Sequence, residues 1–234
     1  MRKFVFVLAG LIAFAAINAQ SLDEIVKKYS EANHQDKISA MSTIKITAKM
    51  SMMGMDLPME MWMKNPDKFK SITSFNGQDI ISVFDGTKGY SINPMTGSSE
   101  PVEMTPDQVK QTQNGIMFNN YMANYLKDGK LTLEGEENVN DKPAFKLKAD
   151  LGNGNSSMIF IDKATYLMVK TSASVNQGGQ AITVDSYPSD YQEMNGIMLP
   201  MKTTSSAQGM DFIMVFDKVE VNIPMEDSLF TIKK

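Results

Sequence analysis

The sequence of 234 residues contains no cysteine, one histidine and one tryptophan. Without cysteine, the chain has no disulfide bond, thiol nucleophile or thiolate metal ligand. The single histidine, His34, stands between Asn33 and Gln35 with no second kind of metal ligand beside it, which predicts a solvated loop rather than a metal or acid–base site. Arg2 is the only arginine, and the lysines are scattered, so no basic stripe favours nucleic acid as a partner.

The sequence also offers little for catalysis. A nucleophilic triad needs a base beside the nucleophile, and the one histidine lies among polar loop residues. The adjacent carboxylates at 136–137 and 226–227 point apart if they lie on strands, so neither pair forms an acid–base dyad. Gly178-Gly179 falls between strand patterns and is typical of a hairpin turn, not a phosphate loop. We expect no enzyme, cofactor or metal site; a carboxylate pair from distant strands is the alternative left open.

The first 19 residues have the pattern of a signal peptide. Arg2 and Lys3 give a positive start, residues 4–16 form an apolar run too short to span a bilayer comfortably, and Ala19 is a small residue at the expected cleavage point. No cysteine follows this run, so lipid cannot be attached there. We therefore expect an exported, periplasmic protein that begins near Gln20; an uncleaved membrane anchor is the alternative.

Methionine is abundant, with 21 residues, and it alternates along two strands predicted within Thr43–Met63. Successive side chains of a strand point to opposite faces, so each arm of this hairpin has one apolar and one mostly polar face. Methionine is flexible and polarizable, which suits binding to a deformable apolar ligand. The hairpin is thus predicted to line a cavity for an acyl chain, and ordinary core filling is the alternative interpretation.

Three helices are expected from capping signals and apolar spacing. Ser21 and Glu24 form a capping box before a helix over about Leu22–Ala32. Thr105, Pro106 and Gln108 start a second helix, and Ile116–Leu126 has the broad apolar, aromatic face of a third. Because the last two interrupt a series of strands, the insertion at about 105–127 is predicted to cover the open mouth of a curved sheet.

The remaining chain is predicted to form short antiparallel strands separated by Asn-Gly and Asp-Gly turns. The expected strands cover 69–75, 79–84, 90–92, 131–136, 144–149, 157–161, 166–174, 181–187, 197–199, 202–207 and 211–221. Residues 211–221 are apolar on both faces, which predicts a central strand. A sheet of about ten strands should curl. We expect a mostly β fold with α insertions: a strongly curved antiparallel sheet (an unclosed β-barrel) with an N-terminal helix and a helical lid, in one domain over 20–234.

The order of these features resembles the outer-membrane lipoprotein-sorting proteins of the LolA/LolB-like superfamily. The resemblance lies in the export signal, the N-terminal helix, the helical insertion and the following segments: Lys64-Asn65-Pro66, Phe69, Asp85-Gly86, Tyr90-Ser91-Ile92-Asn93-Pro94 and Pro224 to Phe230. It implies a monomeric periplasmic carrier that binds the acyl chains of lipoproteins or lipids and delivers them to the outer membrane. Its partners would be the acylated lipoprotein or lipid and membrane-bound donor and acceptor proteins.

The candidate cavity and lid residues combine the methionine face with the aromatic insertion: Met50, Met52, Met59, Met61, Met63, Asn65, Phe69, Phe118, Tyr121, Met122 and Tyr125. In the family, an arginine that helps to fix the lid often precedes the proline after the second strand. Asn65 stands there in this chain, and an amide donates hydrogen bonds but carries no charge. A protein-binding module on the same fold, acting as an envelope sensor, is the alternative function.

Overall fold

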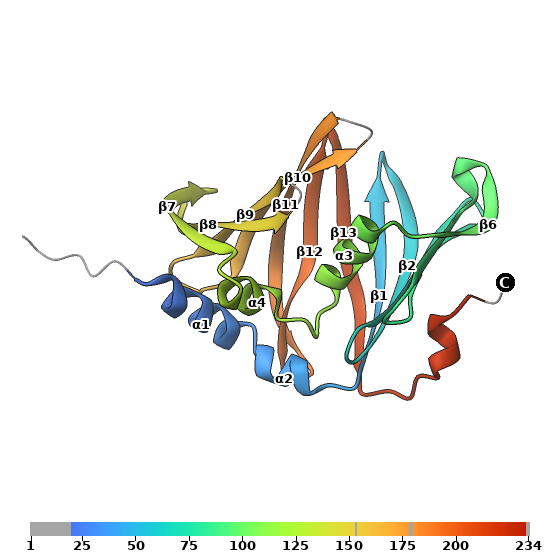
Figure 1. Cartoon of the computed structure of the whole chain (residues 1–234), viewed down its shortest axis with the longest axis horizontal. Coiled ribbons are helices and arrows are strands. Elements are labelled where there is room, and N and C mark those ends of the chain that lie inside the picture. Colours follow the sequence, from blue (N-terminus) through green and yellow to red (C-terminus); the bar gives the residue numbers. More distant parts are fainter. Residues whose placement is uncertain (1–19, 153, 178–179, 233–234) are drawn as a thin grey trace, which may run out of the picture.

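The computed structural model describes residues 20–152, 154–177 and 180–232 and is built around one curled sheet (Figure 1). The predicted signal peptide over 1–19 and the predicted Gly178-Gly179 turn lie outside the described residues. The strands are β1 (Thr43–Met52), β2 (Met55–Lys64), β3 (Lys68–Phe75), β4 (Gln78–Phe84), β5 (Gly89–Asn93), β6 (Ser98–Glu103), β7 (Leu131–Val139), β8 (Lys142–Gly152), β9 (Asn155–Asp162), β10 (Met168–Gln177), β11 (Gln180–Met194), β12 (Ile197–Ala207) and β13 (Met210–Val221).

The strand order explains why helices cross the sheet. The thirteen strands are antiparallel in the order β6-β5-β4-β3-β2-β1-β13-β12-β11-β10-β9-β8-β7, so β6 and β7 form the two edges. These two strands are consecutive in the chain, and the residues between them must therefore run from one edge of the sheet to the other. This connector carries α3 (Pro106–Gly115) and α4 (Tyr121–Lys127), which lie across one face of the sheet (Figure 1).

Two further helices precede the sheet, and their starts differ. At α1 (Leu22–Ala32), the Ser21 hydroxyl accepts a hydrogen bond from Glu24 N at 3.2 Å, which is one half of the predicted capping box. The Glu24 side chain accepts instead from Gln20 Nε2 at 2.9 Å. At α2 (Gln35–Ala40), His34 is the N-cap residue, has a left-handed backbone with φ of 52° and provides no side-chain cap. Short 3₁₀ turns, η1 (Pro94–Thr96) and η2 (Asp227–Phe230), complete the elements.

Most predicted elements are confirmed, including the curved antiparallel sheet and the central position of β13 between β1 and β12. Three predictions were wrong, and one strand was missed. The segment after His34 forms α2 rather than a loop, β6 was not expected, 197–207 is one strand instead of two, and the predicted helix at 116–126 begins only at Tyr121. The Asn120 side chain caps α4 by accepting from Ala123 N at 3.3 Å, which fits the preference of asparagine for helix starts over helix interiors.

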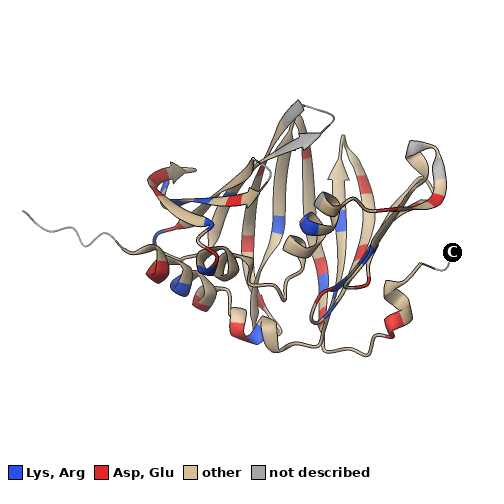
Figure 2. Ribbon diagram, in the orientation of Figure 1, with Lys and Arg blue, Asp and Glu red and all other residues tan. Residues whose placement is uncertain are grey.

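The two faces of the central strands differ in charge. We call the face that carries Ile46 and Met61 the inner face and the opposite one, with Lys45 and Trp62, the outer face. Ile46 lies opposite Met61, and Lys45 lies opposite Trp62, so the register keeps the faces separate. The same registers place the charged side chains of β1–β4 and β12 on the outer face: Lys45, Lys49, Asp56, Glu60, Lys64, Lys68, Lys70, Asp79 and Lys202. Figure 2 shows both signs of charge interspersed along the chain.

Candidate functional site

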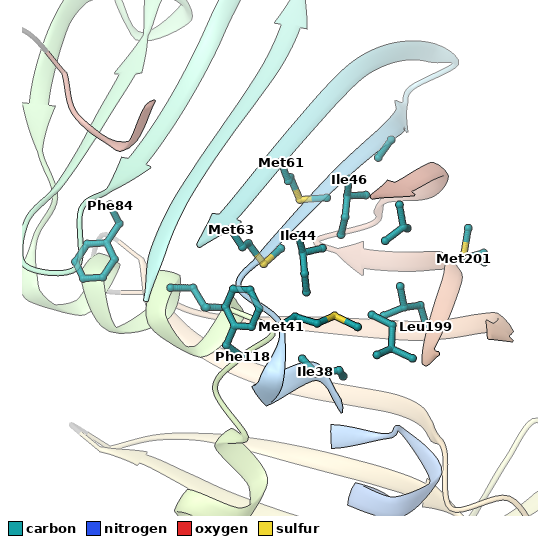
Figure 3. Packing of buried hydrophobic residues seen from close by; sticks show 14 residues of the cluster. Ile38, Met41, Ile44, Ile46, Met61, Met63, Phe84, Phe118, Leu199 and Met201 are labelled. Carbon is teal, nitrogen blue, oxygen red and sulfur yellow. The ribbon is translucent and has the colours of Figure 1, made fainter. Parts of the chain in front are cut away.

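The inner face is filled at its centre by a packed cluster to which the hairpin methionines contribute. Met61 and Met63 are buried against Ile44 and Ile46, with Phe118 of the connector packed over them (Figure 3). Met59 and Phe69 pack on this cluster with partly buried side chains. The centre of the methionine stripe therefore forms packed core in this structure.

A second cluster joins α4 to α1 and to the β7–β9 end of the sheet. Met122 is fully buried and Tyr125 is buried, and they belong to one core cluster with Ile25, Val26 and Leu147, among others. The Tyr121 and Tyr125 rings meet edge to face, with centroids 6.3 Å apart. The aromatic face predicted for one helix is thus divided: Phe118 belongs to the first cluster and α4 to the second.

Burial changes the ionisation of the tyrosines around α4. Loss of solvent raises the pKa of Tyr29 to about 12, although a hydrogen bond with Tyr121 opposes the shift. Burial also raises the pKa of Tyr121, and the neighbouring Tyr29 adds to the effect. These hydroxyls are therefore neutral at physiological pH and act as hydrogen-bonding groups within an apolar wall.

A cavity of about 510 Å³ lies between the β2–β3 turn and the α3–α4 connector. Its volume is within the range of roughly 300–1,000 Å³ that is typical of small-molecule sites. The lining residues are Asn65, Pro66, Asp67, Lys110, Gln113, Asn114, Ile116, Phe118, Asn119, Tyr121, Asn124, Tyr125, Asp128 and Lys130. We call this space the first cavity.

A second cavity of about 220 Å³ lies on the other side of the same connector. Both cavities are lined by Asn114, Ile116, Asn119 and Tyr121, so the connector is the partition between them. The other walls of the second cavity come from α1, α2, β10, β11 and β12 and include Ile38 and Leu199 of the first cluster. Ile116, which lines both cavities, is itself buried in the first cluster, so the partition is anchored to the packed inner face.

α3 is held over the sheet by few contacts. None of its described side chains is buried, and Val109 is its one apolar residue, packed at the margin of the first cluster. Lys110 Nζ donates to the carbonyl of Leu151 on β8, and Asn114 Nδ2 donates to the Tyr125 hydroxyl at 3.2 Å. Little apolar area would be exposed if α3 moved away.

Polar side chains fix the neighbouring wall. Asn65 Nδ2 donates to the carbonyls of Ser39 at 3.0 Å and Met41 at 2.8 Å, and thereby ties the end of β2 to α2. His34 Nδ1 lies 2.9 Å from the carbonyl of Gly196; because a carbonyl only accepts, this nitrogen carries the proton. The Asn65 side chain thus anchors α2, rather than the α3 helix of the connector, to the end of β2.

The structure brings some of the predicted site residues together and not others. Asn65, Phe118, Tyr121 and Tyr125 line the first cavity. The methionines of the hairpin line neither cavity: Met61 and Met63 are packed, and Met50 and Met52 are half-buried further along the inner face. Met59 packs against the first cluster and borders a separate pocket that is lined mostly by outer-face residues of β1–β3. Met122 is buried under α4. That these side chains contact a ligand stays a prediction.

Sequence reasoning missed the polar rim of the first cavity. Asp67, Lys110, Asp128 and Lys130 lie there with several amide side chains. A visible signal was the run of amides on either side of the apolar residues 116–118, at 113–114 and 119–120. Among the described residues no group of three or more metal-ligating side chains lies together, and no helix is long and apolar enough to cross a membrane.

Comparisons with known proteins identify the fold. None of the family models compared with the chain matches it, and neither does any curated sequence. Solved structures do match. One is a LolA superfamily protein from Nitrosomonas europaea, with a TM-score of 0.60 and 13% identity over 91% of this chain and 98% of that chain. Another is a DUF1329 family protein from Desulfovibrio piger, with a TM-score of 0.56 and 13% identity over 88% of this chain and 97% of that chain. A third is a domain from Vibrio parahaemolyticus described as an outer membrane lipoprotein-sorting protein, with a TM-score of 0.57 and 11% identity over 90% of this chain and 97% of that chain.

These matches cover nearly the whole described chain and place it among proteins that wrap one curled antiparallel sheet around helices. The chain has a LolA-like fold. At 11–13% identity the likeness concerns the fold, and the function has to be argued from the site.

Proposed function

We propose that this protein is a periplasmic carrier that holds the acyl chain of a lipid or lipoprotein between the inner face and the α3–α4 connector and delivers it to the outer membrane. One observation carries the proposal: the central strands direct their charged side chains outward, and a weakly attached polar helix covers the uncharged inner face beside two cavities. The carrier role of lipoprotein-sorting proteins with this fold supports it, as does the signal-like start of the chain.

The energetics favour an acyl chain as the cargo. Burial of each methylene group contributes about 0.8 kcal/mol, so an apolar trough alone can hold a long chain firmly. A carrier must also release its cargo, which requires a cover that opens at low cost. α3 meets this need because Val109 is its one apolar anchor, and the methionines of the inner face can change rotamer as the chain enters.

Adjacent residues of β13 provide a matched test. Met214 lies on the inner face opposite Met50, whereas Val215 lies on the outer face between Lys49 and Lys202. Met214→Glu should weaken binding of a fluorescent fatty acid about tenfold or more, because an unpaired carboxylate would replace apolar contacts. Val215→Glu gains two lysine partners and should bind like the wild type.

Native mass spectrometry of protein purified from a bacterial envelope should show bound lipid. A clean ligand-free mass combined with no uptake of the fatty acid would contradict the carrier proposal. Equal loss of binding in both variants would show that the inner face is not the site. A stable protein partner unaffected by Met214→Glu would favour the alternative of a protein-binding module.

A further inference from the structure

We propose that the first cavity binds the head group of a zwitterionic phospholipid, with an ammonium group and a phosphate, while the acyl chain continues toward the inner face. The inference rests on the proposed function, because it takes an acyl chain to be the attached group. It adds the class of head group and the residues that distinguish it from an anionic one.

The cavity changes character from its mouth to its floor. Lys110, Asp128 and Lys130 are exposed at the mouth, and Ile116 and Phe118 are buried at the floor. Half-buried amides lie between these levels: Asn65, Gln113, Asn114 and Asn119. This is the polarity gradient of an amphiphile, with charge in water, hydrogen-bonding groups at the junction and an apolar chain below.

The charges at the mouth have both signs. Lys110 and Lys130 supply ammonium groups for a phosphate, and Asp67 and Asp128 supply carboxylates for an amine. Within the described part of the chain, no ion pair or side-chain hydrogen bond engages Asp67, Asp128 or Lys130. A purely anionic ligand would meet two repelling carboxylates, whereas a zwitterion matches both pairs.

The stability of α4 does not explain the carboxylate of Asp128, and the fold leaves room for the carboxylate of Asp67. Asp128 lies at the C-terminal end of α4, where the helix dipole favours a cation. Asp67 is held close to the β4–β5 turn: a Cβ built on Gly86, whose φ is +99°, would lie 2.7 Å from Asp67 Oδ1. Gly86 thus leaves the room that this carboxylate occupies beside the cavity.

The experiment compares soluble dihexanoyl phosphatidylethanolamine with dihexanoyl phosphatidylglycerol as competitors of a bound fluorescent fatty acid. The wild type should bind the ethanolamine lipid about fivefold more tightly, the size expected for exposed charge pairs. Asp67→Asn combined with Asp128→Asn keeps the shapes and should abolish this preference. Asp211→Asn, an exposed carboxylate outside the cavity, is the control and should retain it.

Lys130→Gln should weaken both lipids equally, because both carry a phosphate. Equal affinities in the wild type, or a preference that persists in the double aspartate variant, would overturn the head-group assignment and leave the carrier proposal standing if the fatty acid still binds. Failure of the fatty acid and of both lipids to bind would overturn the carrier proposal as well.

Discussion

α3 and α4 belong to one connector and cover one face of the sheet, yet they are held in opposite ways. α4 buries Met122 and Tyr125 between α1 and the β7–β9 strands. α3 has one half-buried apolar residue, Val109, and otherwise polar tethers. The difference teaches that a helix can cover the sheet without being part of the core. α4 is packed into the core, whereas α3 buries so little apolar surface that it can separate from the sheet at low cost.

The largest effect should follow from truncating the buried side chain of α4. Met122→Ala should lower the free energy of unfolding by about 2–5 kcal/mol, because it leaves a cavity in the second cluster. Val109→Ala in α3 is the matched control and should cost less than about 1 kcal/mol at a half-buried site. Chemical denaturation measures both, and equal losses would show that α3 is as firmly packed as α4.

Alkaline pH should loosen the α1–α4 contact. Burial raises the pKa of Tyr29 to about 12 in the folded protein, against about 10 for an exposed tyrosine. The unfolded chain therefore loses this proton first, and the stability that the neutral hydroxyl contributes is present below pH 10 and is lost as the pH rises toward 12. Thermal melting between pH 9 and pH 12 should show this loss, and Tyr29→Phe should reduce it.

The smallest effect should come from the start of α3. Thr105 and Gln108 form a reciprocal capping box, with Thr105 N donating to Gln108 Oε1 at 2.8 Å. Thr105→Ala should destabilise α3 locally by about 1 kcal/mol. Amide hydrogen exchange should become about fivefold faster in 108–115 with no change in α4 or in the midpoint of global unfolding. A lower global midpoint would mean that α3 unfolds only with the sheet.

The elements that the sequence predicted well are those with local signals. The N-cap signal at Ser21 and the apolar spacing after it placed α1 correctly, and the two apolar faces of 211–221 indicated the central strand. The helix expected at 116–126 was placed too early, because Asn119 and Asn120 interrupt an otherwise continuous apolar pattern. Here the preference of asparagine for helix caps outweighed periodicity.

The candidate site was harder to predict because it depends on contacts between distant segments. Alternation correctly grouped Met61 with Met63 on one face, but it does not say whether a face is packed or open. The open space lies where the connector from β6 to β7 meets the turn at Asn65, more than forty residues earlier in the chain. The contact between these two segments depends on the strand order and on where the helices pack, and no short stretch of sequence determines either.

The pairing of β1 with β13 has a consequence for how the protein is made. Ile44 lies opposite Val221, so the first strand finds its neighbour only after the last one has been synthesised. Such distant pairing is slow to form, and until it forms both β1 and β12 present bare edges on which other chains can aggregate. The sheet is therefore most exposed to aggregation in the interval before β13 has paired with β1 and β12.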